Sequence, residues 1–217
     1  MTGFLLGVLS SILATVVLGA LAWLRSARFH WWLLGLLSQY SPLGLRRVYR
    51  KQRSTEKDIK RDLAKARWVK VLAGRGNALT RDAFAPLWRG DLSVASVRIL
   101  LPDPEGGPNS WLQRREGDLR QIDRGFAEGV LAEQVRVNTR YLSRVAEERS
   151  GIEVRSFDLP HLWRVVATDQ VAYLTFYPRF SHGRNAPCLY ARAPGLLYDM
   201  ALRLFDSAWS GSAPPRL

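Results

Sequence analysis

The chain has 217 residues, enough for one ordinary domain with a hydrophobic core beside a membrane segment. Its single cysteine, Cys188, excludes an internal disulfide. Lys and Arg number 32 against 19 Asp and Glu, which gives a formal net charge of +13. This excess predicts attraction to polyanions, and charge alone leaves open whether they are anionic lipids, nucleic acid or nucleotide-like ligands.

The first predicted element is a transmembrane helix within residues 1–28. Residues 4–24 form a run of 21 residues without a charge, and a helix of that length spans about 30 Å, the thickness of a bilayer core. A signal peptide is the alternative. No Lys or Arg precedes the run, the run exceeds the usual signal core, and no clear cleavage site follows Leu24. We therefore predict an uncleaved anchor.

The charges behind this run predict its orientation. Residues 25–67 contain 12 Lys or Arg against three acids, whereas the residues before the run carry no charge. The positive-inside rule then places the remainder in the cytoplasm, as a single-pass protein of the inner membrane. The lone Cys188 agrees with a reducing compartment.

Residues 29–37 are nearly all apolar but too few to cross a bilayer as a helix. Trp31 and Trp32 favour the membrane interface, so we expect an interfacial or shallowly re-entrant helix. The alternative is a second span over residues 29–49, which would have to bury two arginines and would reopen the question of orientation.

Residues 46–67 predict a strongly basic juxtamembrane helix, and Ser54 or Thr55 followed by Asp58 resembles a helix start. Such a helix can hold anionic lipid, lie as a solvated face, or contact a nucleic-acid backbone. The residues expected at the membrane surface, besides the two tryptophans, are Arg46, Arg47, Arg50, Lys51 and Arg53.

Residues 68–209 predict one α/β domain with a mixed sheet, and residues 210–217 a disordered tail. Alternating β-rich runs occupy 68–74, 97–102 and 152–157, a hairpin 162–177, and a short strand 187–191. Helical patterns occupy 79–87, 110–149 (divided near Gly125 and Gly129) and 195–209. Strands joined by helices tend to be parallel, and the hairpin must be antiparallel.

The runs at 68–74, 97–104 and 154–174 together resemble one half of the phospholipase D-like fold, over about residues 58–209. Active members of that family carry His-x-Lys-x-x-x-x-Asp on the hairpin, with the His as nucleophile and the Lys holding phosphate oxygens. Arg164 and Asp169 match the spacing of the Lys and the Asp, but Leu162 occupies the nucleophile position.

His161 lies one residue away from that position, which places it on the opposite face of a strand. The Gly-Ser element of the family is also replaced, by residues 174–177. The resemblance therefore implies that catalysis by the family route is lost.

His182, in a polar loop after the hairpin, is the other weak catalytic candidate, and its alternative is an ordinary loop histidine. The histidines and Cys188 show no metal-ligand spacing, and no motif for a bound cofactor is present, so we expect neither metal nor cofactor. The glycine turn at 73–77 suits either the approach of a phosphate or a tight strand-to-helix connection.

These features favour a membrane-anchored, non-catalytic sensor or effector that binds a phosphate-bearing ligand, nucleic acid or a partner protein. Its plan is similar to that of small membrane effectors of bacterial antiphage defence, including those linked to retrons or cyclic nucleotides. The alternatives are a phospholipase D-type phosphodiesterase or nuclease that acts as a dimer, and a structural membrane protein that recruits a partner. The expected ligand-binding residues are Arg75, Arg164, Asp169, Arg179 and Arg184.

Overall fold

The computed structural model of the chain describes residues 42–160, 162–179 and 181–216, together with the isolated positions 23, 26 and 29. The predicted anchor, the interfacial segment with Trp31 and Trp32, and His161 lie outside the described residues. Within the described part of the chain, no helix combines the length and hydropathy needed to cross a bilayer.

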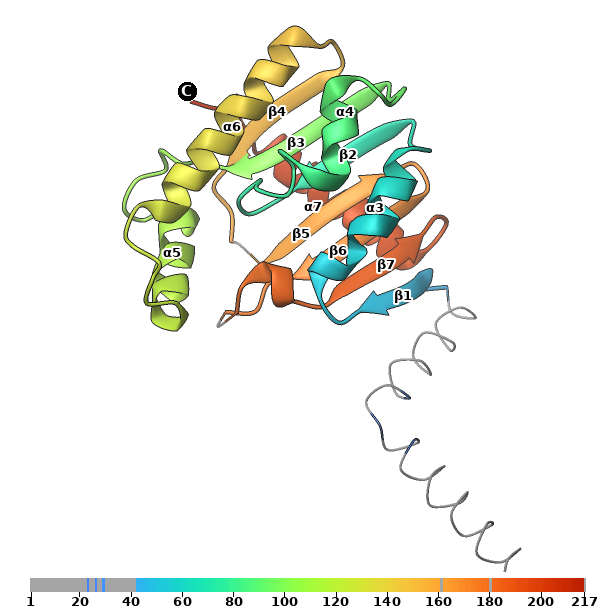
Figure 1. The fold of residues 1–217 in the computed structure, drawn as a ribbon, viewed down its shortest axis with the longest axis horizontal. Helices are drawn as coiled ribbons and strands as arrows, with labels where there is room; N and C mark the ends of the chain where they lie inside the picture. The colour runs from blue at the N-terminus through green and yellow to red at the C-terminus, as the bar shows by residue number, and fades with distance from the viewer. Residues whose placement is uncertain are drawn as a thin grey trace, which may run out of the picture.

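The described domain is built on a mixed sheet of seven strands, in the order β1-β7-β6-β5-β2-β3-β4 (Figure 1). Strands β2, β3 and β4 are parallel, and the remaining pairs are antiparallel. The strands are β1 (Leu45–Tyr49), β2 (Trp68–Leu72), β3 (Ser96–Pro102), β4 (Ile152–Phe157), β5 (Trp163–Thr168), β6 (Val171–Phe176) and β7 (Cys188–Arg192). This confirms the predicted α/β domain with a mixed sheet.

Helices cover both faces of the sheet, with α3, α4 and α6 on one face and α7 on the other (Figure 1). The α-helices are α3 (Glu56–Leu63), α4 (Ala85–Arg89), α5 (Trp111–Ile122), α6 (Val130–Glu148) and α7 (Leu196–Ser210). Short 3₁₀ turns are η1 (Gln52–Thr55), η2 (Asp82–Phe84) and η3 (Gly183–Asn185).

The central strands are apolar on both faces, because each face packs against helices. Val71 of β2 pairs with Ile99 of β3, and both belong to the core under α6. The next pair, Leu72 with Leu100, belongs to the core under α7. Successive residues therefore bury on opposite sides, as the pleat of a strand requires.

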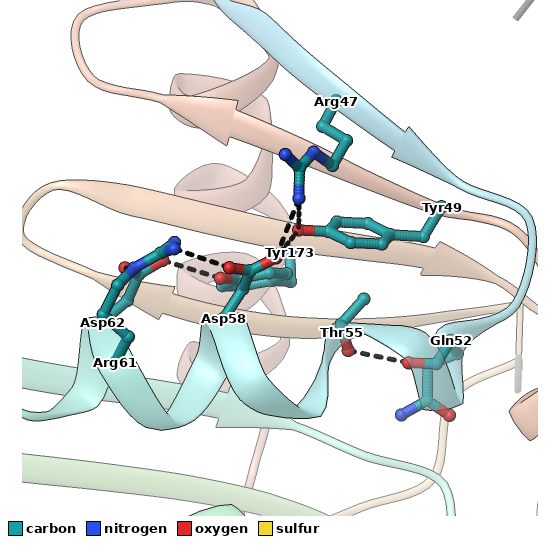
Figure 2. Close-up of polar contacts among 8 residues, drawn as sticks. All are labelled: Arg47, Tyr49, Gln52, Thr55, Asp58, Arg61, Asp62 and Tyr173. Carbon is teal, nitrogen blue, oxygen red and sulfur yellow. Dashed lines mark hydrogen bonds and ion pairs between the residues drawn. The ribbon is translucent and has the colours of Figure 1, made fainter.

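The predicted helix over residues 46–67 is wrong before Glu56 and after Leu63. Leu45–Tyr49 instead forms the edge strand β1, which pairs antiparallel with β7. The helix begins near the predicted start, but the Thr55 hydroxyl donates to the carbonyl of Gln52 at 2.7 Å and does not cap the helix (Figure 2). Local basic composition was the misleading signal, since the strand depends on a partner far along the chain.

A polar network joins β1 and β6 to α3, as Figure 2 shows. The Tyr49 hydroxyl donates to Asp58, Arg47 Nη1 lies 3.1 Å from the same carboxylate, and the Tyr173 hydroxyl donates to Asp62 at 2.6 Å. The hydrogen bond from Tyr49 is the main cause that lowers the pKa of Asp58, with help from Arg61 and Arg47. The network fixes β1 to the domain.

Two further predictions are confirmed and two are corrected. The pattern over residues 110–149 forms two helices, α5 and α6, with Gly125 and Gly129 in the connection between them, and the hairpin forms β5 and β6. The tail was expected to be disordered, but Ala213 forms a two-way backbone bridge with Ser156 of β4. The helix expected over 79–87 is a 3₁₀ turn followed by α4.

Candidate functional site

A cavity of about 480 Å³ lies beyond the carboxyl end of β2. The glycine turn after β2, the start of α6, α5, the end of the hairpin and η3 form its walls. Ligands of open α/β sheets bind outside the carboxyl ends of the strands. Five arginines face this cavity against two carboxylates, and the charged residues are Arg75, Arg81, Arg115, Arg164, Arg184, Asp82 and Asp123. We call it the arginine cavity.

Arg164 of β5 is the most deeply placed of these arginines. Its backbone pairs with Thr175 of β6, and the residue is only 5% exposed. No described carboxylate lies within ion-pair distance of its guanidinium, although ten other arginines of the described chain have such a partner. Arginine stays protonated in proteins, so a positive charge is buried here without a carboxylate.

Arg164 interacts electrostatically with a phenol, Tyr177, and a thiol, Cys188. Burial raises the pKa of Tyr177, and Arg164 only partly opposes this effect. Burial also raises the pKa of the Cys188 thiol. Both groups are therefore uncharged near neutral pH, and neither compensates the guanidinium.

Arg75 comes from the glycine turn and is held by an amide, an imidazole and an aromatic ring. It donates to Oε1 of Gln134 at 3.2 Å, lies 3.4 Å from Nδ1 of His182, and covers the ring of Phe126. Burial lowers its pKa, and the charges of Arg115 and Arg184 lower it further. Asp123 acts in the opposite direction, but no described carboxylate forms an ion pair with Arg75, so its guanidinium can bind a ligand.

Arg115 comes from α5 and has backbone partners. Its guanidinium donates to the carbonyls of Pro178, Arg179 and Ser181 at 3.2, 2.9 and 2.8 Å. Burial lowers the pKa of Arg115 as well. These bonds fix the loop after the hairpin against α5 and hold the guanidinium in position.

The geometry speaks against His182 as a free base. Its Nε2 lies 3.2 Å from Oδ2 of Asp123, and its Nδ1 faces Arg75, which can only donate. Nδ1 is therefore the acceptor, and Nε2–H donates to the carboxylate. Both ring nitrogens are engaged.

The structure brings together four of the residues singled out in the sequence, namely Arg75, Arg164, Arg184 and His182. It does not bring Asp169 or Arg179 into the arginine cavity. Asp169 lies in the β5–β6 turn, where Arg67 donates to it from its backbone at 2.8 Å and its side chain at 3.0 Å. Burial would raise the pKa of Asp169, but these bonds outweigh it and the pKa is lowered.

Arg179 pairs with Asp118 at 3.0 Å. Leu162, at the position of the family nucleophile, is 52% exposed. Of the residues expected at the membrane surface, Arg46, Arg50, Lys51 and Arg53 are exposed strand or turn residues, and Arg47 belongs to the network of Figure 2.

Sequence reasoning missed Arg115 and Tyr177. Arg115 is one of many charges in a helical pattern and carries no motif, whereas Tyr177 falls in the segment that replaces the Gly-Ser element. Among the described residues, no group of three or more His, Cys, Asp or Glu could hold a metal ion.

The chain resembles known proteins only among solved structures, and at low sequence identity. No protein-family model and no curated protein match the chain. Similar solved structures include the archaeal chromatin protein TrmBL2, described as showing a novel mode of DNA binding (TM-score 0.46, 12% identity, 98% of this chain and 70% of that chain). They also include NucT from Helicobacter pylori (TM-score 0.44, 12% identity, 75% of this chain and 92% of that chain). A third is Nuc from Salmonella typhimurium, a phospholipase D family member (TM-score 0.45, 12% identity, 74% of this chain and 90% of that chain). The chain is similar to these proteins in fold, at low identity.

Proposed function

We propose that this chain binds a phosphate-bearing ligand in the arginine cavity and does not cleave it. The observation that carries the proposal is Arg164, a guanidinium that is 5% exposed, lines the cavity and has no described carboxylate as partner. A buried charge without compensation is costly. A bound anion would supply the compensation, and the fork of arginine fits phosphate oxygens two at a time.

The contrast with other arginines supports this reading. Arg67 pairs with Asp169, and Arg136 pairs with both Glu105 and Glu133. Arg75 and Arg115 of the cavity instead use amide, imidazole and carbonyl groups, which orient a guanidinium without forming an ion pair with it. An electropositive cavity with fixed donors is suited to a multiply charged anion.

The absence of cleavage rests on two positions. Leu162 has no group that could attack phosphorus, and it occupies the place of the nucleophile in the resembled family. Nδ1 of His182 faces the guanidinium of Arg75 at 3.4 Å, so His182 would have to lose this contact before it could accept a proton from water. The alternative function is a phospholipase D-type nuclease that acts as a dimer, and the experiment below also tests for it.

We also propose that the chain is anchored in the membrane through its N-terminal segment. The uncharged residues 4–24 and the basic residues that follow support an anchor in the inner membrane with the domain in the cytoplasm. Exposed Arg46, Arg50 and Lys51 in and next to β1 would then contact anionic lipids. This combination of an anchor and a ligand-binding domain fits a sensor or effector of antiphage defence, which would act with a protein partner or a second copy of the chain.

The experiment uses the purified full chain in detergent. Titration calorimetry with pyrophosphate measures binding by the wild type and by the variants Arg164→Gln and Arg184→Gln. Arg140→Gln is the matched control, since Arg140 is exposed on α6 and outside the cavity. We expect both cavity variants to lose at least about tenfold in affinity, because each removes charge-assisted hydrogen bonds.

Phosphodiesterase assays on lipid, DNA and RNA accompany the titrations. Turnover by the wild type would overturn the non-catalytic proposal. Equal binding by the wild type and the cavity variants would overturn the proposed site.

A further inference from the structure

A second cavity of about 320 Å³ adjoins the arginine cavity, and the two share Asn77 and Arg81. One wall of this groove is apolar and comes from Val130 and Val137 of α6. These valines are two helical turns apart and so lie on the same side of the helix. Val137 is 53% exposed, so the groove presents apolar surface at its mouth.

The polar groups of the groove are amides held in fixed positions. Nδ2 of Asn138 donates to the carbonyl of Arg75 at 2.8 Å and to Oδ1 of Asn77 at 2.6 Å. Gln134 accepts from Arg75 through Oε1, and its two N–H donors have no partner among the described residues. Rigid amides beside apolar surface form the kind of lining that recognises the edge of a planar heterocycle.

The groove is also less positively charged than the arginine cavity. Its acidic side chain, Glu133, forms an ion pair with Arg136. Arg81, at the junction, is held by the carbonyl of Asn77 through its Nε. The two cavities therefore suit two chemically different ends of one ligand, a charged end and an uncharged, planar end.

Depth and volume restrict the size of the charged end. Cavities of about 300–1,000 Å³ are typical of small-molecule sites, and the arginine cavity is within that range. The guanidinium of Arg164 is too deeply buried for a phosphate inside a continuous double helix, whose backbone cannot enter a cavity of this size. A terminal phosphate can be inserted end-on.

We infer that the ligand is a small nucleotide, with its phosphate against Arg164 in the arginine cavity and its base in the groove between Val137 and the amide of Gln134. This inference rests on the proposed function, since it names the class of the phosphate-bearing ligand. An inorganic phosphate or a lipid head group would occupy only the arginine cavity and leave the groove empty.

The test compares probes that share the phosphate and differ in the base. Titration calorimetry on the full chain in detergent uses the four common nucleoside 5′-monophosphates, ribose 5-phosphate, and a single-stranded oligonucleotide without terminal phosphates. We expect at least one monophosphate to bind about tenfold or more tightly than ribose 5-phosphate, which is the discrimination that one good base contact provides. The oligonucleotide should bind more weakly than that monophosphate.

Variants separate the two ends of the site. Val137→Ser should reduce the advantage of the nucleotide over ribose 5-phosphate by at least about threefold, because apolar contact with the base is lost. Tyr141→Ala is the matched control, an exposed residue one turn farther along α6 and outside both cavities, and it should change nothing. Arg184→Gln should weaken both probes.

The outcomes distinguish the two proposals. Equal binding of every monophosphate and ribose 5-phosphate, lost together in Arg184→Gln, would overturn the nucleotide inference and leave the proposed function standing. Tighter binding of the oligonucleotide would overturn the inference in favour of a polymer. If no phosphate compound binds, the proposed function fails and the inference fails with it.

Discussion

Replacement of Arg164 by Met should make the protein more stable and less able to bind phosphate. The two residues are similar in length, so Met can follow the path of the arginine side chain from β5. Arg164 is 5% exposed, and its neighbours Tyr177 and Cys188 are uncharged near neutral pH because burial raises the pKa of each. The substitution therefore removes a buried charge and deprives no described carboxylate of a partner.

The magnitudes follow from these contacts. Exchange of buried ion pairs for apolar side chains of similar volume is often neutral or stabilises proteins by about 1–4 kcal/mol, and Arg164 has no described carboxylate to offset its cost of burial. Water in the open cavity reduces the cost of the charge, so we expect the free energy of unfolding to rise by about 1–2 kcal/mol and the Tm by about 2–8 °C. Loss of two charge-assisted hydrogen bonds of about 1.5 kcal/mol each should lower the affinity for pyrophosphate about 100-fold.

Denaturant unfolding of the full chain, with and without pyrophosphate, measures both effects. The matched control is Arg67→Met, which removes an arginine that is paired with Asp169 at 3.0 Å. This control should lower stability slightly, by up to about 1 kcal/mol, and leave binding unchanged. A loss of stability of more than 1 kcal/mol in Arg164→Met would show that the fold itself compensates the guanidinium, and the reasoning for the site would fail.

Three further predictions concern the network, the core and the glycine turn. Asp58→Asn should cost about 1–2 kcal/mol, because the carboxylate accepts from Tyr49. Because the pKa of Asp58 is lowered in the folded state, its carboxylate stabilises the fold fully above about pH 4, and this contribution is lost as the pH falls through the folded-state pKa. The free energy of unfolding should therefore depend less steeply on pH in this acidic range in the variant than in the wild type. Phe205→Ala, at a fully buried position of α7 that faces the sheet, should cost about 3–5 kcal/mol in denaturant unfolding. Gly76→Ala should cost about 1–2 kcal/mol and weaken pyrophosphate binding, because φ is +79° and the new Cβ would lie 3.1 Å from Cβ of Asn138; unchanged stability would contradict the strain argument.

Most strands could be predicted because their signal is local. Val69 and Val71 alternate in β2, and the turn residues at Asp169 and Gln170 separate two β-rich runs that must pair. β1 could not be predicted, because its two arginines suggested a basic helix. It is a strand through pairing with β7, more than 130 residues later, and through the bond from Tyr49 to Asp58.

The candidate site could be predicted only in part. Arg164 was found through its spacing to Asp169, yet Asp169 lies in the turn at the other end of the strand, bonded to Arg67. The spacing of two residues in the sequence gives their separation along the strand. It does not show which end of the sheet forms a cavity. Arg115 had no local signal, because its role depends on how α5 packs against the loop that follows the hairpin.

The sequence by itself determined the excess of positive charge, the order of strands and helices after residue 68, the antiparallel hairpin and the uncharged run at residues 4–24. These follow from composition and from periods of two and 3.6 residues, which neighbouring side chains alone define. Only the tertiary structure decided which arginines share a cavity. Arg75, Arg115, Arg164 and Arg184 come from four different elements, and the parallel crossovers and the hairpin gather them at one end of the sheet. That none of these four forms an ion pair with a described carboxylate is likewise a property of the folded chain, because the residues that pack beside a charged group decide whether it has an ionic partner.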